Sequence, residues 1–125
     1  MLMEYADIKP IDIDGIKVQF IEKEIFLVND RDNKTVGFLI YDYFSDNIPF
    51  LSKLYINEGY KSKALDKKLI KIWELEMKNQ GHDLVMATTL SNETEESFYK
   101  NLGYKYSGNV VLLNNPLEVI FSKKL

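Results

Sequence analysis

The sequence contains no cysteine, which excludes disulfide bonds, cysteine-based zinc sites and cysteine nucleophiles together. Histidine occurs once, as His82, so a site built from several histidine ligands is excluded too. Proline and glycine are sparse, at three and six residues, and no linker rich in them divides the chain. Because 125 residues are enough to bury a core, we expect one domain over residues 1–125.

Long apolar runs and a strong charge bias are also absent. The sequence has no run of about 18 apolar residues, so we expect no helix that spans a membrane. The start, MLMEYADIKP, lacks the basic and apolar segments of a signal peptide. A net charge of −3 argues against general nucleic-acid binding, which needs a basic surface. These features predict a soluble cytoplasmic domain that binds neither nucleic acid nor membranes.

The first half of the chain has the pattern of β-strands. Residues 8–13 and 16–21 flank Asp14-Gly15, a pair that favours a tight hairpin turn. Further strands are expected at 24–28, 35–44 and 48–56, separated by loops rich in turn residues at 29–33 and 45–47. The pattern indicates an antiparallel meander.

A long amphipathic helix is expected from Ser62 onward. Its apolar positions recur every three or four residues and form one stripe: Ala64, Leu65, Leu69, Ile70, Ile72, Trp73 and Met77. Glu74 and Lys78 have the spacing and order of a favourable ion pair along a helix. Gly81 is the expected end of the helix, and a short buried strand at 83–89 follows it.

The last part of the chain predicts a second helix and two closing strands. Asn92 and Glu95 have the spacing of a capping box, and Gly103 ends the helix. The strands are expected at 104–108 and 110–121, the latter interrupted by Asn114-Asn115-Pro116. The order of elements predicts an α+β fold, with both helices packed on a mainly antiparallel, mixed sheet.

The final apolar stretch, LEVIFSKKL, bears on oligomeric state. As the last strand of the chain it is expected at a sheet edge, where it invites pairing into a homodimer. Lys123 and Lys124 at its end can equally guard such an edge against pairing. The sequence leaves both interpretations open.

The junction between the strand at 48–56 and the long helix suggests an anion site. The first N–H groups of a helix have no partners within the helix, and its dipole favours negative charge there. The side chains near this point include four lysines, Lys61, Lys63, Lys67 and Lys68. The pattern predicts a phosphate-bearing ligand, although a solvated basic surface has the same pattern.

Two segments together, LYINEGYKSKALDKKLI and SNETEESFYKNLGYKYSG, resemble the GNAT superfamily of acyl-CoA-dependent N-acetyltransferases. In that family the first segment cradles the pyrophosphate of coenzyme A on backbone N–H groups. The resemblance places this role on six consecutive residues, namely Lys61, Ser62, Lys63, Ala64, Leu65 and Asp66. In the second segment Asn92 and Tyr99 stand at the spacing that the family uses, which adds Asn92 to the coenzyme-binding residues.

The resemblance also implies a reaction, in which acetyl-CoA is the cosubstrate and a primary amine of a small molecule or protein is the acceptor. Tyr99 is the expected general acid for the departing thiolate, because a tyrosine with an ordinary pKa near 10 is protonated at neutral pH. A backbone N–H around Leu54, Tyr55 or Ile56 is expected to polarise the thioester carbonyl. The pantetheine is expected between that strand and the strand at 83–89.

No general base stands out. Glu58 is expected to face water, and His82 is expected to be a surface residue. Tyr41 and Asp42 lie on a strand that can line the acceptor side, but the alternation of a strand leaves open which of them faces it.

Departures from the family pattern support a second hypothesis. Ala64 and Asp66 occupy positions where the family has small residues, and Lys61 occupies a position usually held by arginine or glutamine. A carboxylate about 6 Å from a phosphate costs about 3 kcal/mol per unit charge at an effective dielectric of about 20, and under about 1 kcal/mol if well solvated. Family members usually have one or two helices between the first strand and the meander, whereas residues 8–25 are expected to form strands here. The alternative is therefore a non-catalytic GNAT-like interaction module with weak or lost coenzyme binding.

Overall fold

The structure is a computed structural model, and it describes residues 11–13, 16–22, 24–60, 63–90, 96–111 and 118–125. The chain folds into two compact units. The first unit comprises residues 1–41 and 53–71, and the second comprises residues 42–52 and 72–125. Within the described residues, no helix is long and apolar enough to cross a membrane.

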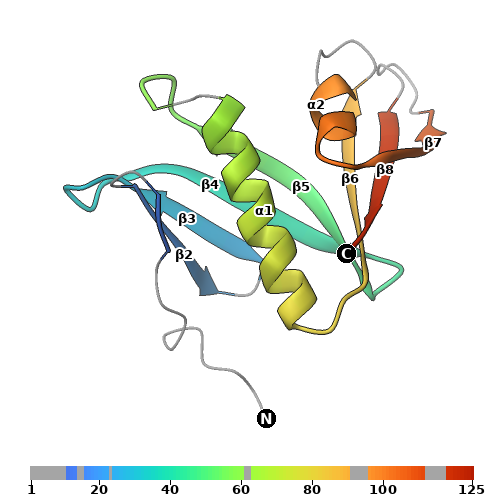
Figure 1. Cartoon of the computed structure of the whole chain (residues 1–125), viewed down its shortest axis with the longest axis horizontal. Helices are drawn as coiled ribbons and strands as arrows, with labels where there is room; N and C mark the ends of the chain where they lie inside the picture. The colour runs from blue at the N-terminus through green and yellow to red at the C-terminus, as the bar shows by residue number, and fades with distance from the viewer. Residues whose placement is uncertain (1–10, 14–15, 23, 61–62, 91–95, 112–117) are drawn as a thin grey trace. The chain divides into compact units, whose positions relative to one another are not determined.

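The first unit contains an antiparallel meander (Figure 1). Its strands are β1 (Ile11–Ile13), β2 (Ile16–Glu22), β3 (Ile25–Asn29) and β4 (Thr35–Phe44), of which β4 continues into the second unit. The hairpin expected around residues 14–15 is confirmed, because Ile13 and Ile16 are partners across β1 and β2. Glu24 has a φ of 75° in the tight turn before β3, so that strand begins one residue later than predicted.

A hairpin turn joins β4 to β5 (Ile48–Ile56), and both strands have the predicted bounds. Ser45 and Asp46 have positive φ angles of 51° and 67°, and the Asn47 N–H donates to the Phe44 carbonyl over 3.3 Å. Two central residues with positive φ define the turn whose twist matches that of paired strands. The turn residues predicted at 45–47 are therefore confirmed.

The helix α1 (Lys63–Asn79) begins in the first unit and ends in the second. The predicted stripe is buried at five of its positions, with Ile72 half-buried and Ala64 exposed. Trp73 is completely buried, which confirms it as a core residue. The helix ends as predicted at Gly81, whose φ is 98° and whose N–H donates to the Lys78 carbonyl, while the His82 N–H donates to the Met77 carbonyl. These two bonds form a Schellman motif.

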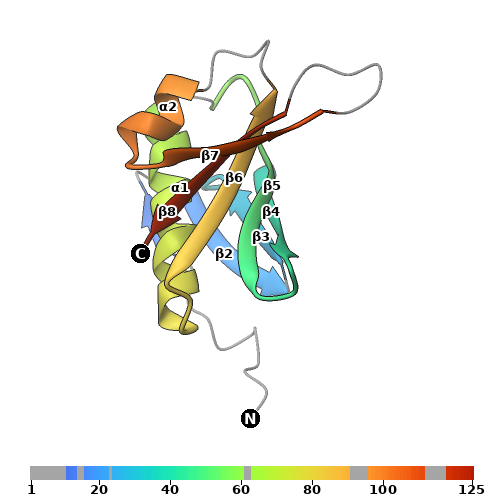
Figure 2. The ribbon, with the colours of Figure 1, turned by 90° about the vertical axis from the view of Figure 1, so that its right-hand side faces the viewer.

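The second unit contains four further elements: β6 (Leu84–Leu90), α2 (Glu96–Asn101), β7 (Lys105–Val110) and β8 (Glu118–Lys124). β5 pairs with β6 in parallel, whereas β8 pairs antiparallel with both β6 and β7, as Figure 2 shows for the last three strands. The hydrogen-bonded neighbours follow the order β1-β2-β3-β4-β5-β6-β8-β7. The α+β class with a mixed, mainly antiparallel sheet is confirmed.

Two predictions about the end of the chain are wrong. Val110 belongs to β7, and the last strand runs from Glu118 to Lys124 rather than ending at Phe121. β8 is also not an edge strand, because it is paired on both sides. The interpretation of β8 as an exposed dimerisation edge is therefore wrong, and so is the guarding role of Lys123, which binds Glu74 instead.

Candidate functional site

The C-terminal part of β5 lies very close to β4. Gly37 on β4 faces this part of β5, and a Cβ atom at position 37 would lie only 2.5 Å from the Tyr55 carbonyl oxygen and 3.2 Å from the Ile56 Cα. Only glycine permits an approach this close. The three β5 residues of the predicted coenzyme site differ in exposure, since Leu54 is half-buried, Tyr55 is 49% exposed and Ile56 is 4% exposed.

The burial pattern of β5 changes its phase in the middle of the strand. Pro49 and Leu51 are buried, then Ser52 and Lys53 are both exposed, and Ile56 is buried again. A regular strand alternates its faces with a period of two, so two adjacent exposed residues indicate a local irregularity. The apolar and aromatic pattern of residues 48–56 gave no sign of this change.

Pairing between β5 and β6 is short. It comprises two residue pairs, Phe50 with Met86 and Leu51 with Ala87, and in the described structure it does not extend to the rest of β5. β5 continues for five residues beyond the last pair, to Ile56. Among the described residues, the ladder between β5 and β6 therefore ends at Leu51.

The turn that follows β5 is held by backbone hydrogen bonds. The Asn57 N–H donates to the Val36 carbonyl of β4 over 2.8 Å, and the Tyr60 N–H donates to the Asn57 carbonyl over 2.9 Å. The Tyr55 hydroxyl also donates to Asn57 Oδ1 over 3.0 Å. Glu58 is exposed, as predicted. The turn is therefore fixed to β4 and leads toward the start of α1.

The first turn of α1 holds part of the predicted phosphate site. Ala64 is exposed, Leu65 is 6% exposed and Asp66 is half-buried. Lys67 and Lys68 are exposed. Lys61 and Ser62 lie outside the described residues, and only the backbone of Lys63 is described. The first unit thus brings together the residues expected to bind the coenzyme on β5 and on the first turn of α1.

Tyr99, the expected general acid, lies on α2 in the second unit and is 5% exposed. Its ring stacks on Phe121 of β8, with centroids 5.6 Å apart and an interplanar angle of 23°. Phe98 and Tyr104 contact it edge-on, each with a centroid distance of 5.4 Å. The aromatic contacts fix the orientation of the ring. Asn92, the remaining predicted site residue, and Glu95 lie outside the described residues.

The end of α2 brings Tyr104 onto Tyr99. Gly103 has a φ of 93°, its N–H donates to the Lys100 carbonyl, and the Tyr104 N–H donates to the Tyr99 carbonyl, both over 3.0 Å. This is again a Schellman motif, in which the residue after the glycine commonly contacts the last turn of the helix. The predicted stop at Gly103 is confirmed, and the motif explains the ring contact between Tyr104 and Tyr99.

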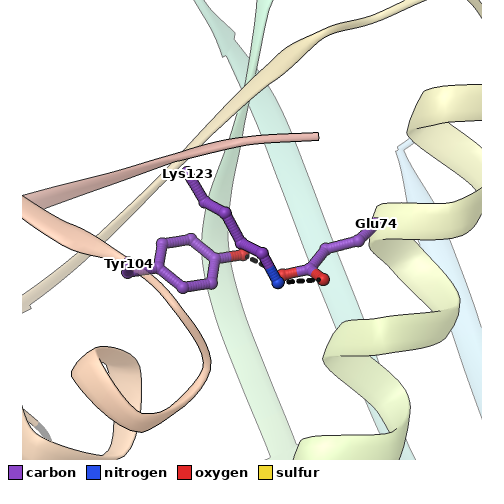
Figure 3. A network of polar contacts seen from close by, with 3 residues as sticks. All are labelled: Glu74, Tyr104 and Lys123. Atoms are coloured by element: carbon purple, nitrogen blue, oxygen red, sulfur yellow. Dashed lines mark hydrogen bonds and ion pairs between the residues drawn. The ribbon is translucent and has the colours of Figure 1, made fainter.

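A buried polar network in the second unit connects α1, β8 and Tyr104, which lies between α2 and β7 (Figure 3). Glu74 of α1 is 7% exposed, its Oε2 accepts the Tyr104 hydroxyl over 2.7 Å, and its Oε1 accepts Lys123 Nζ over 2.9 Å. Burial, and secondly the Glu74 carboxylate, raise the pKa of the Tyr104 phenol far above its usual value. The expected ion pair between Glu74 and Lys78 is wrong, because Glu74 turns inward and binds Lys123.

The residues considered as bases have different surroundings. Tyr41 is 1% exposed, and Asp42 is the exposed neighbour, with its Oδ2 accepting the Ser52 hydroxyl over 2.7 Å. His82 is half-buried, and its ring lies 5.8 Å from that of Tyr43. In the part of the chain that the structure describes, no three His, Asp or Glu side chains form a group suited to a metal ion.

Comparison with protein families identifies the family to which this chain belongs. The model of the "Acetyltransferase (GNAT) domain" family matches residues 22–106, which is more than half of the chain. The chain belongs to the GNAT acetyltransferase family. The match covers β3 to α2 and most of the two segments that carried the resemblance in the sequence.

Solved structures share the GNAT fold at low sequence identity. A GNAT family acetyltransferase from Elizabethkingia anophelis with acetyl-CoA bound has a TM-score of 0.68 and 11% identity, over 89% of this chain and 77% of that one. An aminoglycoside 6′-acetyltransferase type Ii has a TM-score of 0.67 and 21% identity, over 82% and 70%. A chain of the NatC complex bound to a Gag peptide and CoA has a TM-score of 0.69 and 17% identity, over 82% and 72%. No curated protein is significantly similar to this GNAT chain in sequence.

Proposed function

We propose that this GNAT domain is an N-acetyltransferase that transfers the acetyl group of acetyl-CoA to a primary amine of a small molecule or a protein. Family membership over residues 22–106 supports this function, as do similar folds crystallised with acetyl-CoA or CoA. The observation that carries the proposal is the junction from β5 through a fixed turn to the N-terminus of the 17-residue helix α1.

In this proposal the coenzyme binds along that junction. The start of α1, residues 63–66, holds the pyrophosphate, because the helix dipole favours an anion at this end of the helix. Lys67 and Lys68 are exposed on the same helix and add positive charge. The pantetheine runs along β5 beyond Leu51, which is the last residue of the ladder to β6 among the described residues.

The proposed reaction requires two groups of the protein, a backbone N–H and a general acid. A backbone N–H of Leu54, Tyr55 or Ile56 donates to the thioester carbonyl oxygen and stabilises the negative charge that develops on it. The amine nitrogen attacks the carbonyl carbon, so that the C–N bond forms and the C–S bond breaks. Tyr99 donates its phenolic proton to the departing thiolate, and the proton lost by the amine passes to water.

A transfer assay tests this function. The protein is incubated with acetyl-CoA and a panel of small primary amines and lysine-containing peptides, and release of free thiol is followed. For an accepted amine, Tyr99→Phe is expected to lower kcat by about 10²-fold or more, because a general acid typically contributes about 10²- to 10⁴-fold. Tyr106→Phe is the matched control, since Tyr106 is 57% exposed on β7. A Tyr99→Phe variant with unchanged kcat would contradict the general-acid role.

Asp66 favours the second candidate, a non-catalytic GNAT-like module. Its carboxylate is half-buried in the first turn of α1, where the proposed pyrophosphate site lies. Repulsion of the order of 1–3 kcal/mol would weaken binding about 5- to 150-fold. Calorimetric titration with CoA compares the wild type with Asp66→Gly and Asp66→Ala. Binding found only in the two variants would favour the module, whereas tight binding by the wild type would exclude it.

A further inference from the structure

Asp30 is a nearly buried carboxylate in the first unit that the proposed mechanism does not use. It begins the turn between β3 and β4 and is 9% exposed. Its Oδ1 accepts the backbone N–H groups of Asp32 and Lys34, each over 2.9 Å. Its own N–H donates to the Lys34 carbonyl over 2.9 Å. The turn therefore holds the carboxylate in one orientation, with Oδ2 left for another partner.

That partner is Tyr60, thirty residues further along the chain. Its hydroxyl donates to Asp30 Oδ2 over 3.1 Å. The pKa of Asp30 is lowered, mainly by the hydrogen bond from the Lys34 N–H and also by the Tyr60 hydroxyl. The pKa of Tyr60 is raised, chiefly by its hydrogen bond to Asp30. Both shifts favour the observed pair, an ionised carboxylate and a neutral phenol.

Tyr60 is the last described residue before α1, and it belongs to the turn that follows β5. The N–H of Asn57, at the start of this turn, donates to the Val36 carbonyl of β4. The Asp30–Tyr60 bond holds the other end of the turn to the loop between β3 and β4. The four residues 57–60 are thus fixed at both ends, and residues 61 and 62 separate them from the start of α1, which is proposed to hold the pyrophosphate.

We infer that Asp30 and Tyr60 are positioning residues for the coenzyme, which act by holding the turn 57–60 and so fix where the chain leads into the start of α1, the proposed pyrophosphate site. This inference rests on the proposed function. A turn that is held in place before binding need not be ordered by the ligand. The apparent affinity for CoA is proportional to the fraction of molecules in the binding conformation, so it falls when that fraction falls. Because one hydrogen bond contributes about a factor of five to such an equilibrium, Tyr60→Phe is expected to weaken CoA binding by at most about fivefold.

The experiment titrates CoA and pantetheine, which lacks the pyrophosphate, into the wild type, Tyr60→Phe and the control Tyr106→Phe. The Kd for CoA is expected to rise by between about two- and fivefold in Tyr60→Phe alone, whereas the Kd for pantetheine is unchanged. A general loss of structure would weaken both ligands. Hydrogen exchange of the Tyr60 amide, whose N–H donates to Asn57, is expected to become faster in Tyr60→Phe without any ligand.

Asp30→Asn provides the conservative partner variant. Its amide oxygen can still accept the two backbone N–H groups, and its amide nitrogen can donate to the Tyr60 oxygen. Asp30→Asn is therefore expected to bind CoA more tightly than Asp30→Ala does. In a protein that already carries Tyr60→Phe, Asp30→Asn is expected to leave the Kd for CoA unchanged.

The outcomes separate this inference from the proposed function. CoA binding by the wild type with less than a twofold change in Tyr60→Phe overturns the positioning role and leaves the proposed function standing. An equal loss of affinity for CoA and for pantetheine in Tyr60→Phe overturns the positioning role as well. A wild type that does not bind CoA overturns both.

Discussion

Replacing Glu74 with glutamine removes the charge at the centre of the network that it forms with Tyr104 and Lys123. The carboxylate is nearly buried and accepts hydrogen bonds of 2.7 Å and 2.9 Å, whereas the Lys123 side chain is 23% exposed. An amide can keep the bond to Tyr104, but it leaves the ammonium without its ionic partner. Breaking a fully buried pair in this way costs about 3–5 kcal/mol.

The partial exposure of Lys123 reduces this cost, because water can solvate the ammonium when its partner is lost. We expect Glu74→Gln to lower the free energy of unfolding by about 2–3 kcal/mol, and the melting temperature by about 10 °C. Denaturant titration at pH 7 measures the change. Trp73, the single tryptophan, directly precedes Glu74 in the sequence and is completely buried, so its fluorescence reports unfolding.

The double variant Glu74→Gln with Lys123→Met is the control. It removes both charges, so no ammonium is left without a partner, and we expect it to recover more than half of the lost stability. If Glu74→Gln changes the free energy of unfolding by less than about 0.5 kcal/mol, or if the double variant is the less stable of the two, the reasoning about the buried pair is refuted.

Three further predictions concern stability. The raised pKa of Tyr104 means that the folded state keeps a proton that the unfolded state releases above about pH 10, so stability is full below that pH and falls above it. The fall, of up to about 1.4 kcal/mol per pH unit in denaturant titrations, is expected to be smaller in Tyr104→Phe, and equal slopes would disprove it. Leu69→Ala on α1, at a position 1% exposed, is expected to cost about 3 kcal/mol by the same method, whereas Leu75→Ala, at a position 56% exposed, stays within about 0.5 kcal/mol. Gly37→Ala is expected to lower the melting temperature, because its methyl group would meet the Tyr55 carbonyl oxygen at 2.5 Å; an unchanged melting temperature would show that β4 and β5 can separate at little cost.

The sequence predicted best those elements whose signals are local. The bounds of β4 and β5 were predicted correctly because turn residues flank continuous apolar and aromatic runs. Gly81 and Gly103 were recognised as helix ends because only glycine readily adopts the positive φ that both positions have.

Features that depend on long-range pairing could not be predicted in the same way. An apolar strand at the end of a chain has the same local pattern whether it lies at an edge or between two strands, so the position of β8 between β6 and β7 was missed. The partner of Glu74 was missed for the same reason, since Lys123 is 49 residues away. One signal was present, because Glu74 follows Ile70 by four positions and thus lies on the apolar stripe of α1.

The candidate site was predicted in part. The family and the strand, turn and helix of the coenzyme junction followed from the two segments, and the family match confirms that resemblance. The roles of Tyr99 and of the pyrophosphate residues stay predictions. The Asp30–Tyr60 bond was not foreseen, because it joins two turns that are thirty residues apart.

Calorimetric titration of the wild-type protein with acetyl-CoA tests the central claim most directly. We expect saturable binding of one acetyl-CoA per chain, with a Kd in the micromolar range that enzymes commonly show for their substrates. The affinity is expected to fall as salt concentration rises, because an anion bound at a helix N-terminus near lysines is screened. The absence of any binding up to millimolar acetyl-CoA would contradict the account and leave a GNAT fold without its coenzyme.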